Sequence, residues 1–197
     1  METALDLVHI GRGLPVAEQA VTSGLAAALS PIARVVVQAP PGTGKTTYIP
    51  ALAATRAPGR VLVTQPRRIA ARAAAERLAA LTRTKVGDLF GYRVRGDTRT
   101  TPATAVEFCT TGVLLRTLLD HPDLPGVSTV ILDEVHERQL DSDLVIAMIA
   151  EVAELRDDLT VIAYLLRTTP AALLTPPDQQ TTLTGVPEDY EPEEIDR

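Results

Sequence analysis

Residues 34–47 read RVVVQAPPGTGKTT, an apolar run followed by a glycine-rich turn and the start of a helical segment. Backbone N–H groups of such a turn point inward and cradle phosphate oxygens, and the N-terminus of the following helix adds partial positive charge. Lys45 would reach the β- and γ-phosphates of a nucleotide, and the Thr46 hydroxyl would bind Mg²⁺. The stretch therefore predicts a strand, a helix and between them a nucleotide-binding loop: Gly42, Thr43, Gly44, Lys45, Thr46 and Thr47.

A second signal lies at residues 130–138, VILDEVHER, where an apolar run ends in adjacent carboxylates. Asp133 would hold Mg²⁺, and Glu134 would orient and deprotonate the water that attacks the γ-phosphate. Both motifs follow strands, so both are expected at the carboxyl edge of one sheet, where open α/β folds bind ligands. Taken alone, the two acids could instead cap a helix.

The rest of the chain has the pattern of an α/β fold, because short β-branched runs alternate with alanine- and leucine-rich stretches. Its 197 residues, 45% of them hydrophobic, suffice for one domain with a mostly parallel sheet flanked by helices. Strands are expected at 34–39, 60–64, 105–110, 129–132 and 159–163. Helices are expected at 16–29, 45–54, 67–80, 112–119 and 142–155, with a bend or stop at Pro50.

Charge is distributed unevenly along the chain, whose net charge is −6. Residues 67–99 hold nine basic and three acidic side chains, whereas residues 186–197 hold six acidic and one basic. A polyanion could bind the basic segment, and a solvated arginine-rich helix face is the alternative. Five prolines and many acids follow residue 164, so we predict a disordered acidic C-terminal tail.

The single cysteine, Cys109, lies in an apolar run and allows no internal disulfide. It is therefore expected to be a core thiol in a reducing cytoplasm. The sequence shows neither a secretion signal nor the ~18 apolar residues that span a bilayer, so no membrane partner is expected.

Four ordered motifs together resemble a known family. DEVHER at 133–138 resembles the D-E-x-H-E-R box of DEAH-type helicases, and TQPRR at 64–68 resembles their first strand-contacting motif. TTGVLLR at 110–116 resembles the next one, and with GYRVR at 91–95 the chain looks most like bacterial HrpB-type DEAH-box helicases. The resemblance covers about residues 14–163. It implies a RecA-like P-loop NTPase fold, the first of the two such domains of an RNA or DNA helicase that uses ATP and Mg²⁺.

The resemblance also implies which residues meet nucleic acid. They would hold a single strand of RNA or DNA through its backbone: Arg67, Arg68, Thr111, Gly112 and Arg116. Arginine, hydroxyl and N–H donors grip phosphates without reading bases, so binding should be sequence-independent and sensitive to salt.

Two further residues match family positions. Arg77 matches the arginine on which the family stacks adenine, with a solvated arginine as the alternative. His136 is similar to the catalytic-site histidine that links the nucleotide to the neighbouring domain, with a hydrogen-bonded structural histidine as the alternative.

The resemblance ends after residue 163, where AYLLRTT at 163–169 stands in place of the family's Ser-Ala-Thr motif. We therefore predict a lead-in at 1–13, the helicase domain at 14–163 and an unrelated tail at 164–197 of a truncated or frame-shifted helicase. Without a second RecA-like domain, which another chain would supply as a partner, hydrolysis should be weak or absent. An AAA-type ATPase and a non-catalytic nucleotide-binding or interaction module are the alternative functions.

Overall fold

The computed structural model describes residues 5–17, 34–40, 42–133 and 140–165. Its strands are β1 (Arg34–Gln38), β2 (Arg60–Gln65), β3 (Phe90–Val94), β4 (Asp97–Arg99), β5 (Val106–Thr110), β6 (Val127–Leu132) and β7 (Thr160–Leu165). Its helices are α1 (Leu7–Gly11), α4 (Lys45–Ala54), α5 (Arg68–Leu81), α6 (Thr111–Asp120) and α7 (Leu140–Leu155).

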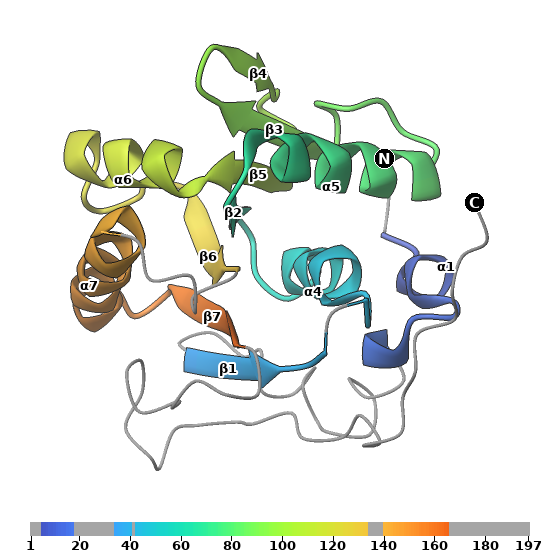
Figure 1. Cartoon of the computed structure of the whole chain (residues 1–197), viewed down its shortest axis with the longest axis horizontal. Coiled ribbons are helices and arrows are strands. Elements are labelled where there is room, and N and C mark those ends of the chain that lie inside the picture. Colours follow the sequence, from blue (N-terminus) through green and yellow to red (C-terminus); the bar gives the residue numbers. More distant parts are fainter. Residues whose placement is uncertain (1–4, 18–33, 41, 134–139, 166–197) are drawn as a thin grey trace.

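The strands form one seven-stranded sheet in the order β1-β7-β6-β2-β5-β3-β4. Every neighbouring pair is parallel except β3 and β4, which are antiparallel. Helices α1, α4 and α5 lie on one face of the sheet, and α6 and α7 lie on the other (Figure 1). The predicted α/β class with a mostly parallel sheet is confirmed.

The central strands are mostly apolar because both of their faces are buried. In β2, Val61 and Val63 join the core beneath α4 and α5, whereas Leu62 joins the core beneath α6 and α7. All six residues of β6 are buried as well. The carboxyl ends of the parallel strands meet at one edge of the sheet, and this brings together the loops that carry both predicted motifs.

The β3–β4 hairpin and α1 were not predicted. The hairpin turns at Arg95 and Gly96, where Gly96 has a φ of 81°. Apart from residues 16 and 17, the predicted helix at 16–29 lies outside the described residues, as does the predicted tail from 166 onward. No helix among the described ranges is long and apolar enough to cross a bilayer.

Two elements continue beyond a point where a stop was expected. Helix α4 does not stop at Pro50, which is buried, and it continues to Ala54. Strand β7 continues to Leu165, and its Tyr164 pairs with Val37 of β1 and is 1% exposed. Tyr164 therefore belongs to the core and not, as predicted, to the tail.

Candidate functional site

The loop between β1 and α4 has the shape that the glycines of its sequence permit. Gly42 and Gly44 have φ values of 80° and 85°, in the left-handed region that costs other residues about 1–2 kcal/mol. Thr43 is fully buried between them, and its hydroxyl donates to the carbonyl of Pro40 at 3.0 Å. Gly44 is also the N-cap of α4, so the positive end of the helix dipole lies at this loop.

An N-terminal segment, whose contact with the loop was not predicted, supports the loop from outside. The N–H of Val16 donates to the carbonyl of Thr43 at 3.1 Å. The Leu14 side chain packs so closely on Gly44 that a β-carbon there would lie 2.8 Å from its methyl groups. Residues 14–16 thus stabilise the loop together with the hydrogen bonds within the loop itself.

Lys45 begins α4 and is only 9% exposed. Its ammonium donates to the carbonyl of Ala39, at the start of the loop, at 3.4 Å. The hydroxyl of Tyr164 donates to the backbone carbonyl of Lys45 at 3.2 Å. Burial raises the pKa of Tyr164 well above its usual value and the charge of Asp133 raises it further, so this hydroxyl stays protonated.

Asp133 directly follows β6 and meets residues from two other elements. Its Oδ2 accepts from the Thr46 hydroxyl at 3.1 Å and from Nε2 of Gln65 at 2.7 Å. Its backbone N–H donates to the hydroxyl of Thr64 at 3.0 Å. The structure therefore brings both motifs to one point. At the end of β2, Thr64 holds the backbone of Asp133 and Gln65 orients its carboxylate.

The side-chain oxygens of Thr46 and Asp133 could both be ligands of one Mg²⁺ ion. Hydroxyl and carboxylate oxygens are hard ligands, and their 3.1 Å separation is about that of neighbouring ligands of an octahedral magnesium ion. Within the described ranges, no group of three or more His, Cys, Asp or Glu side chains could hold a metal. Two protein oxygens suit Mg²⁺, which is commonly bound by one or two protein ligands together with substrate phosphates and water.

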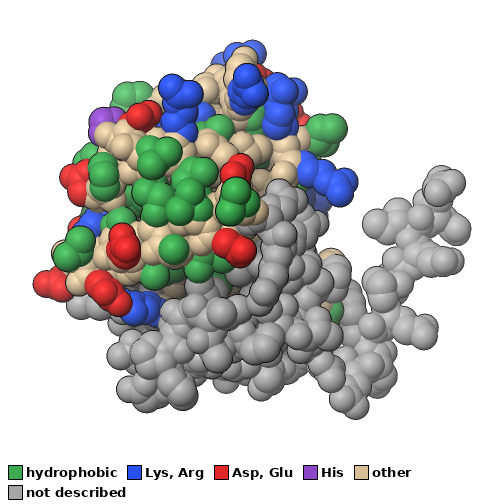
Figure 2. Space-filling model, turned by 60° about the vertical axis from the view of Figure 1, so that its left-hand side comes forward, with side chains coloured by type: hydrophobic (Ala, Val, Ile, Leu, Met, Phe, Trp, Pro, Cys, Tyr) green, Lys and Arg blue, Asp and Glu red, His purple; other side chains and the backbone are tan. Residues whose placement is uncertain are grey.

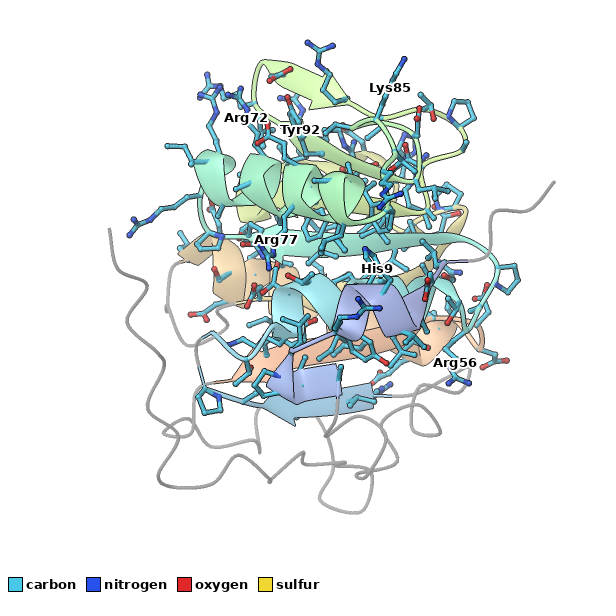
Figure 3. The ribbon with its side chains drawn as sticks, turned by 90° about the vertical axis from the view of Figure 1, so that its right-hand side faces the viewer. His9, Arg56, Arg72, Arg77, Lys85 and Tyr92 are labelled. Atoms are coloured by element: carbon cyan, nitrogen blue, oxygen red, sulfur yellow. The ribbon has the colours of Figure 1, made fainter. Side chains whose placement is uncertain are left out.

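Two of the remaining residues predicted to serve the nucleotide site lie within the described ranges, and two lie outside them. Thr47 lies in the first turn of α4. Arg77 is exposed on α5 and extends toward α4 (Figure 3). Glu134 and His136 lie outside the described residues, so their catalytic roles stay predictions.

The predicted nucleic-acid residues follow two neighbouring strands. Arg67 is the exposed N-cap of α5, and Arg68 begins that helix. The register pairs Gln65 of β2 with Thr110 of β5, so the chain leaves the sheet toward α5 and α6 from adjacent strand ends. Thr111 and Gly112 begin α6, and Arg116 follows one turn later.

A hollow of about 720 Å³ lies beside the start of α6. Three arginines, Arg93, Arg95 and Arg116, and one carboxylate, Asp120, line it together with Thr110, Gly112, Val113 and Thr117. Figure 2 shows Lys and Arg side chains gathered at the hairpin end of this face and acidic ones lower on it. Arg93 and Arg95 were not predicted as binding residues, because nothing in the run GYRVR indicates that β3 pairs with β5.

Comparisons with known proteins show which family the chain belongs to. Residues 16–172 match the DEAD/DEAH box helicase family. The chain belongs to this family. It is 45% identical over 152 residues to the ATP-dependent RNA helicase HrpB of Escherichia coli K12, and this alignment covers 76% of the chain. It is 37% identical over 134 residues to a DExH-box ATP-dependent RNA helicase of Arabidopsis thaliana.

The crystal structure of the E. coli DExH-box NTPase HrpB matches with a TM-score of 0.76 at 37% identity and covers 86% of the chain. The match confirms the helicase RecA-like fold. The chain corresponds to 18% of the length of the E. coli helicase and 14% of the Arabidopsis one. None of these matches supports an AAA-type ATPase or a non-catalytic module.

Proposed function

We propose that the chain binds Mg²⁺-ATP and single-stranded RNA as the first RecA-like domain of a DEAH-box helicase. The observation that carries the proposal is the convergence of Thr46 and Asp133, 3.1 Å apart, beside a buried lysine. The basic residues that follow β2 and β5 lie at the same edge of the sheet as the nucleotide site. The nucleotide and the RNA strand would therefore be bound at neighbouring sites.

Each residue of the nucleotide site would have a separate task. The N–H groups of the loop would cradle the phosphates, and Lys45 would exchange the Ala39 carbonyl for a phosphate oxygen. Thr46 and Asp133 would hold Mg²⁺, which neutralises phosphate charge when bound. Glu134 would accept the proton of the attacking water.

Hydrolysis by this chain alone should be slow. An arginine finger accelerates related phosphoryl transfers by about 10³–10⁵, and we propose that a second RecA-like domain supplies it. A cytoplasmic setting is supported by the single cysteine and its burial.

RNA is the proposed strand because the E. coli and Arabidopsis relatives are RNA helicases by name. The residues that would contact it are cations, a hydroxyl and helix N–H groups, which bind phosphates rather than base edges. Affinity should therefore change little with sequence and fall steeply with salt.

The nucleotide proposal is tested by titrating a fluorescent ATP analogue with and without Mg²⁺. We expect Lys45→Ala to weaken binding by at least about tenfold, since it removes the one cation buried in the loop. Lys85→Ala is the matched control, because Lys85 is the chain's other lysine and is exposed. Equal binding by the wild type and Lys45→Ala would contradict the proposal.

Turnover and strand binding are measured separately. Single-stranded RNA should stimulate a slow ATPase, and Glu134→Gln should lose turnover while keeping ATP. Duplex unwinding by the chain alone would show that no second domain is needed.

A further inference from the structure

Arg72, Tyr92 and Asp97 form a polar cluster between α5 and the β3–β4 hairpin. Nη2 of Arg72 lies 2.7 Å from Oδ2 of Asp97, and the Tyr92 hydroxyl donates to the same oxygen at 2.9 Å. The Arg72 guanidinium also lies 5.7 Å from the centre of the Tyr92 ring. Figure 3 shows Arg72 and Tyr92 side by side where α5 meets the hairpin. We call these three residues the hairpin cluster.

The hairpin cluster is more constrained than an ordinary surface ion pair. Tyr92 is only 7% exposed and belongs to the core beneath α5, so its ring and hydroxyl have fixed positions. The Arg72 side chain is 38% exposed, but its Nε is buried with no hydrogen-bond partner among the described residues. An arginine over an aromatic ring and a carboxylate with two donors restrict each other's geometry.

The position of Asp97 shows what the hairpin cluster holds. Asp97 begins β4 directly after the Arg95–Gly96 turn, and β4 is a three-residue strand that pairs with β3 at the edge of the described sheet. Arg72 lies four residues after Arg68 and hence on the same side of α5. The hairpin cluster thus ties the turn to the end of α5 where the predicted nucleic-acid cations lie.

We propose that the hairpin cluster is a positioning device for nucleic-acid binding. It holds Arg95 at the hollow beside α6, so that Arg95 and the cations at the start of α5 bind the backbone of one strand. The inference rests on the proposed function, because it assumes that the chain binds RNA. Arg72, Tyr92 and Asp97 act through Arg95 and are positioning residues.

The test depends on a difference in sign. Asp97→Asn makes a basic surface more positive by one charge, so long-range electrostatics alone would tighten RNA binding. Positioning requires the opposite result, about three- to tenfold weaker binding, because Arg95 loses its fixed place. The slope of log K against log salt should also become shallower by about 0.7, the value of one phosphate contact to a single strand.

The matched control is Asp88→Asn. Asp88 is exposed on the loop before β3, where it accepts the N–H of Lys85. The substitution makes the same change of charge in the same basic segment without touching the hairpin cluster. It should leave RNA binding unchanged or tighten it, as measured by anisotropy of a labelled single-stranded RNA. Tighter binding by Asp97→Asn would overturn the inference.

A double-mutant cycle separates positioning from a general loss of structure. Arg95→Ala should weaken RNA binding, and Asp97→Asn added to it should cause no further loss. Additive losses, or a parallel loss of ATP-analogue binding, would overturn the inference. Tyr92→Phe keeps the ring and removes only the hydroxyl, so it repeats the test with a smaller expected loss if Asp97→Asn fails to fold.

The two proposals fail in different ways. A wild-type chain that binds no RNA would overturn the proposed function, and this inference with it. A wild-type chain that binds RNA, with Asp97→Asn and Tyr92→Phe binding at least as tightly, would overturn this inference alone.

Discussion

Gly44→Ala should destabilise the chain through two separate effects. The φ of 85° at Gly44 is left-handed and costs an alanine about 1–2 kcal/mol. The new β-carbon would also lie 2.8 Å from both methyl groups of Leu14, and such overpacking costs about 1–3 kcal/mol more. We expect the free energy of unfolding to fall by the sum of the two effects, about 2–5 kcal/mol.

Gly42→Ala is the matched control in the same loop. Its φ is 80° and a β-carbon there would have no neighbour within 4 Å, so only the backbone cost of about 1–2 kcal/mol applies. Leu14→Ala removes the methyl groups that the new β-carbon would meet. Measured against the Leu14→Ala variant, Gly44→Ala should therefore cost only as much as Gly42→Ala does. Urea unfolding without nucleotide, followed by circular dichroism, measures all of these changes. Equal losses for the two glycine variants with Leu14 in place would refute the reasoning.

Three more outcomes are expected. Gln65→Leu removes the donor that orients Asp133, so Mg²⁺-dependent binding of the ATP analogue should weaken about tenfold while Mg²⁺-free binding stays; equal losses would contradict this. Burial, and secondarily the charge of Glu107, raises the pKa of Cys109 to about 12. Native Cys109 should therefore resist alkylation by iodoacetamide at pH 8, as measured by mass spectrometry. The contribution of the buried thiol to the free energy of unfolding is complete below the usual thiol pKa and declines as pH rises toward 12. The carboxylate of Glu107 is only 1% exposed and pairs with Arg60 and Arg93, so Glu107→Leu should lower the free energy of unfolding by about 3 kcal/mol. Asp120 pairs with Arg116 on the surface, so the control Asp120→Asn should change it by under about 0.5 kcal/mol.

Local sequence predicted the elements whose signals are local. Residues 45–54 were expected as a helix and form α4 with the same bounds, because the glycine N-cap and the alanine- and leucine-rich second half act within one segment. The buried strands β2 and β6 were recognised because burial on both faces requires continuous apolar runs.

The sheet edge was not recognised from sequence. In FGYRV at 90–94, glycine and arginine stand between the apolar residues, so the run is not continuously apolar. Arg93 is present there because its guanidinium pairs with Glu107 of the neighbouring strand. Strand β4 has three residues, two of them charged, and exists through its pairing with β3. Such strands depend on neighbours that are distant in sequence, so no local pattern indicates them.

The sequence by itself determined the phosphate-binding loop, the class of fold and the family, because left-handed glycines, a helix start and strand-ending acids each act over a few residues. Only the tertiary structure decided which side chains serve the site. Gln65 reaches Asp133 and Tyr164 reaches Lys45 because β2, β6 and β7 lie in a particular order and register. Strand order is set by the burial of whole faces, and this free energy belongs to no single segment of the chain.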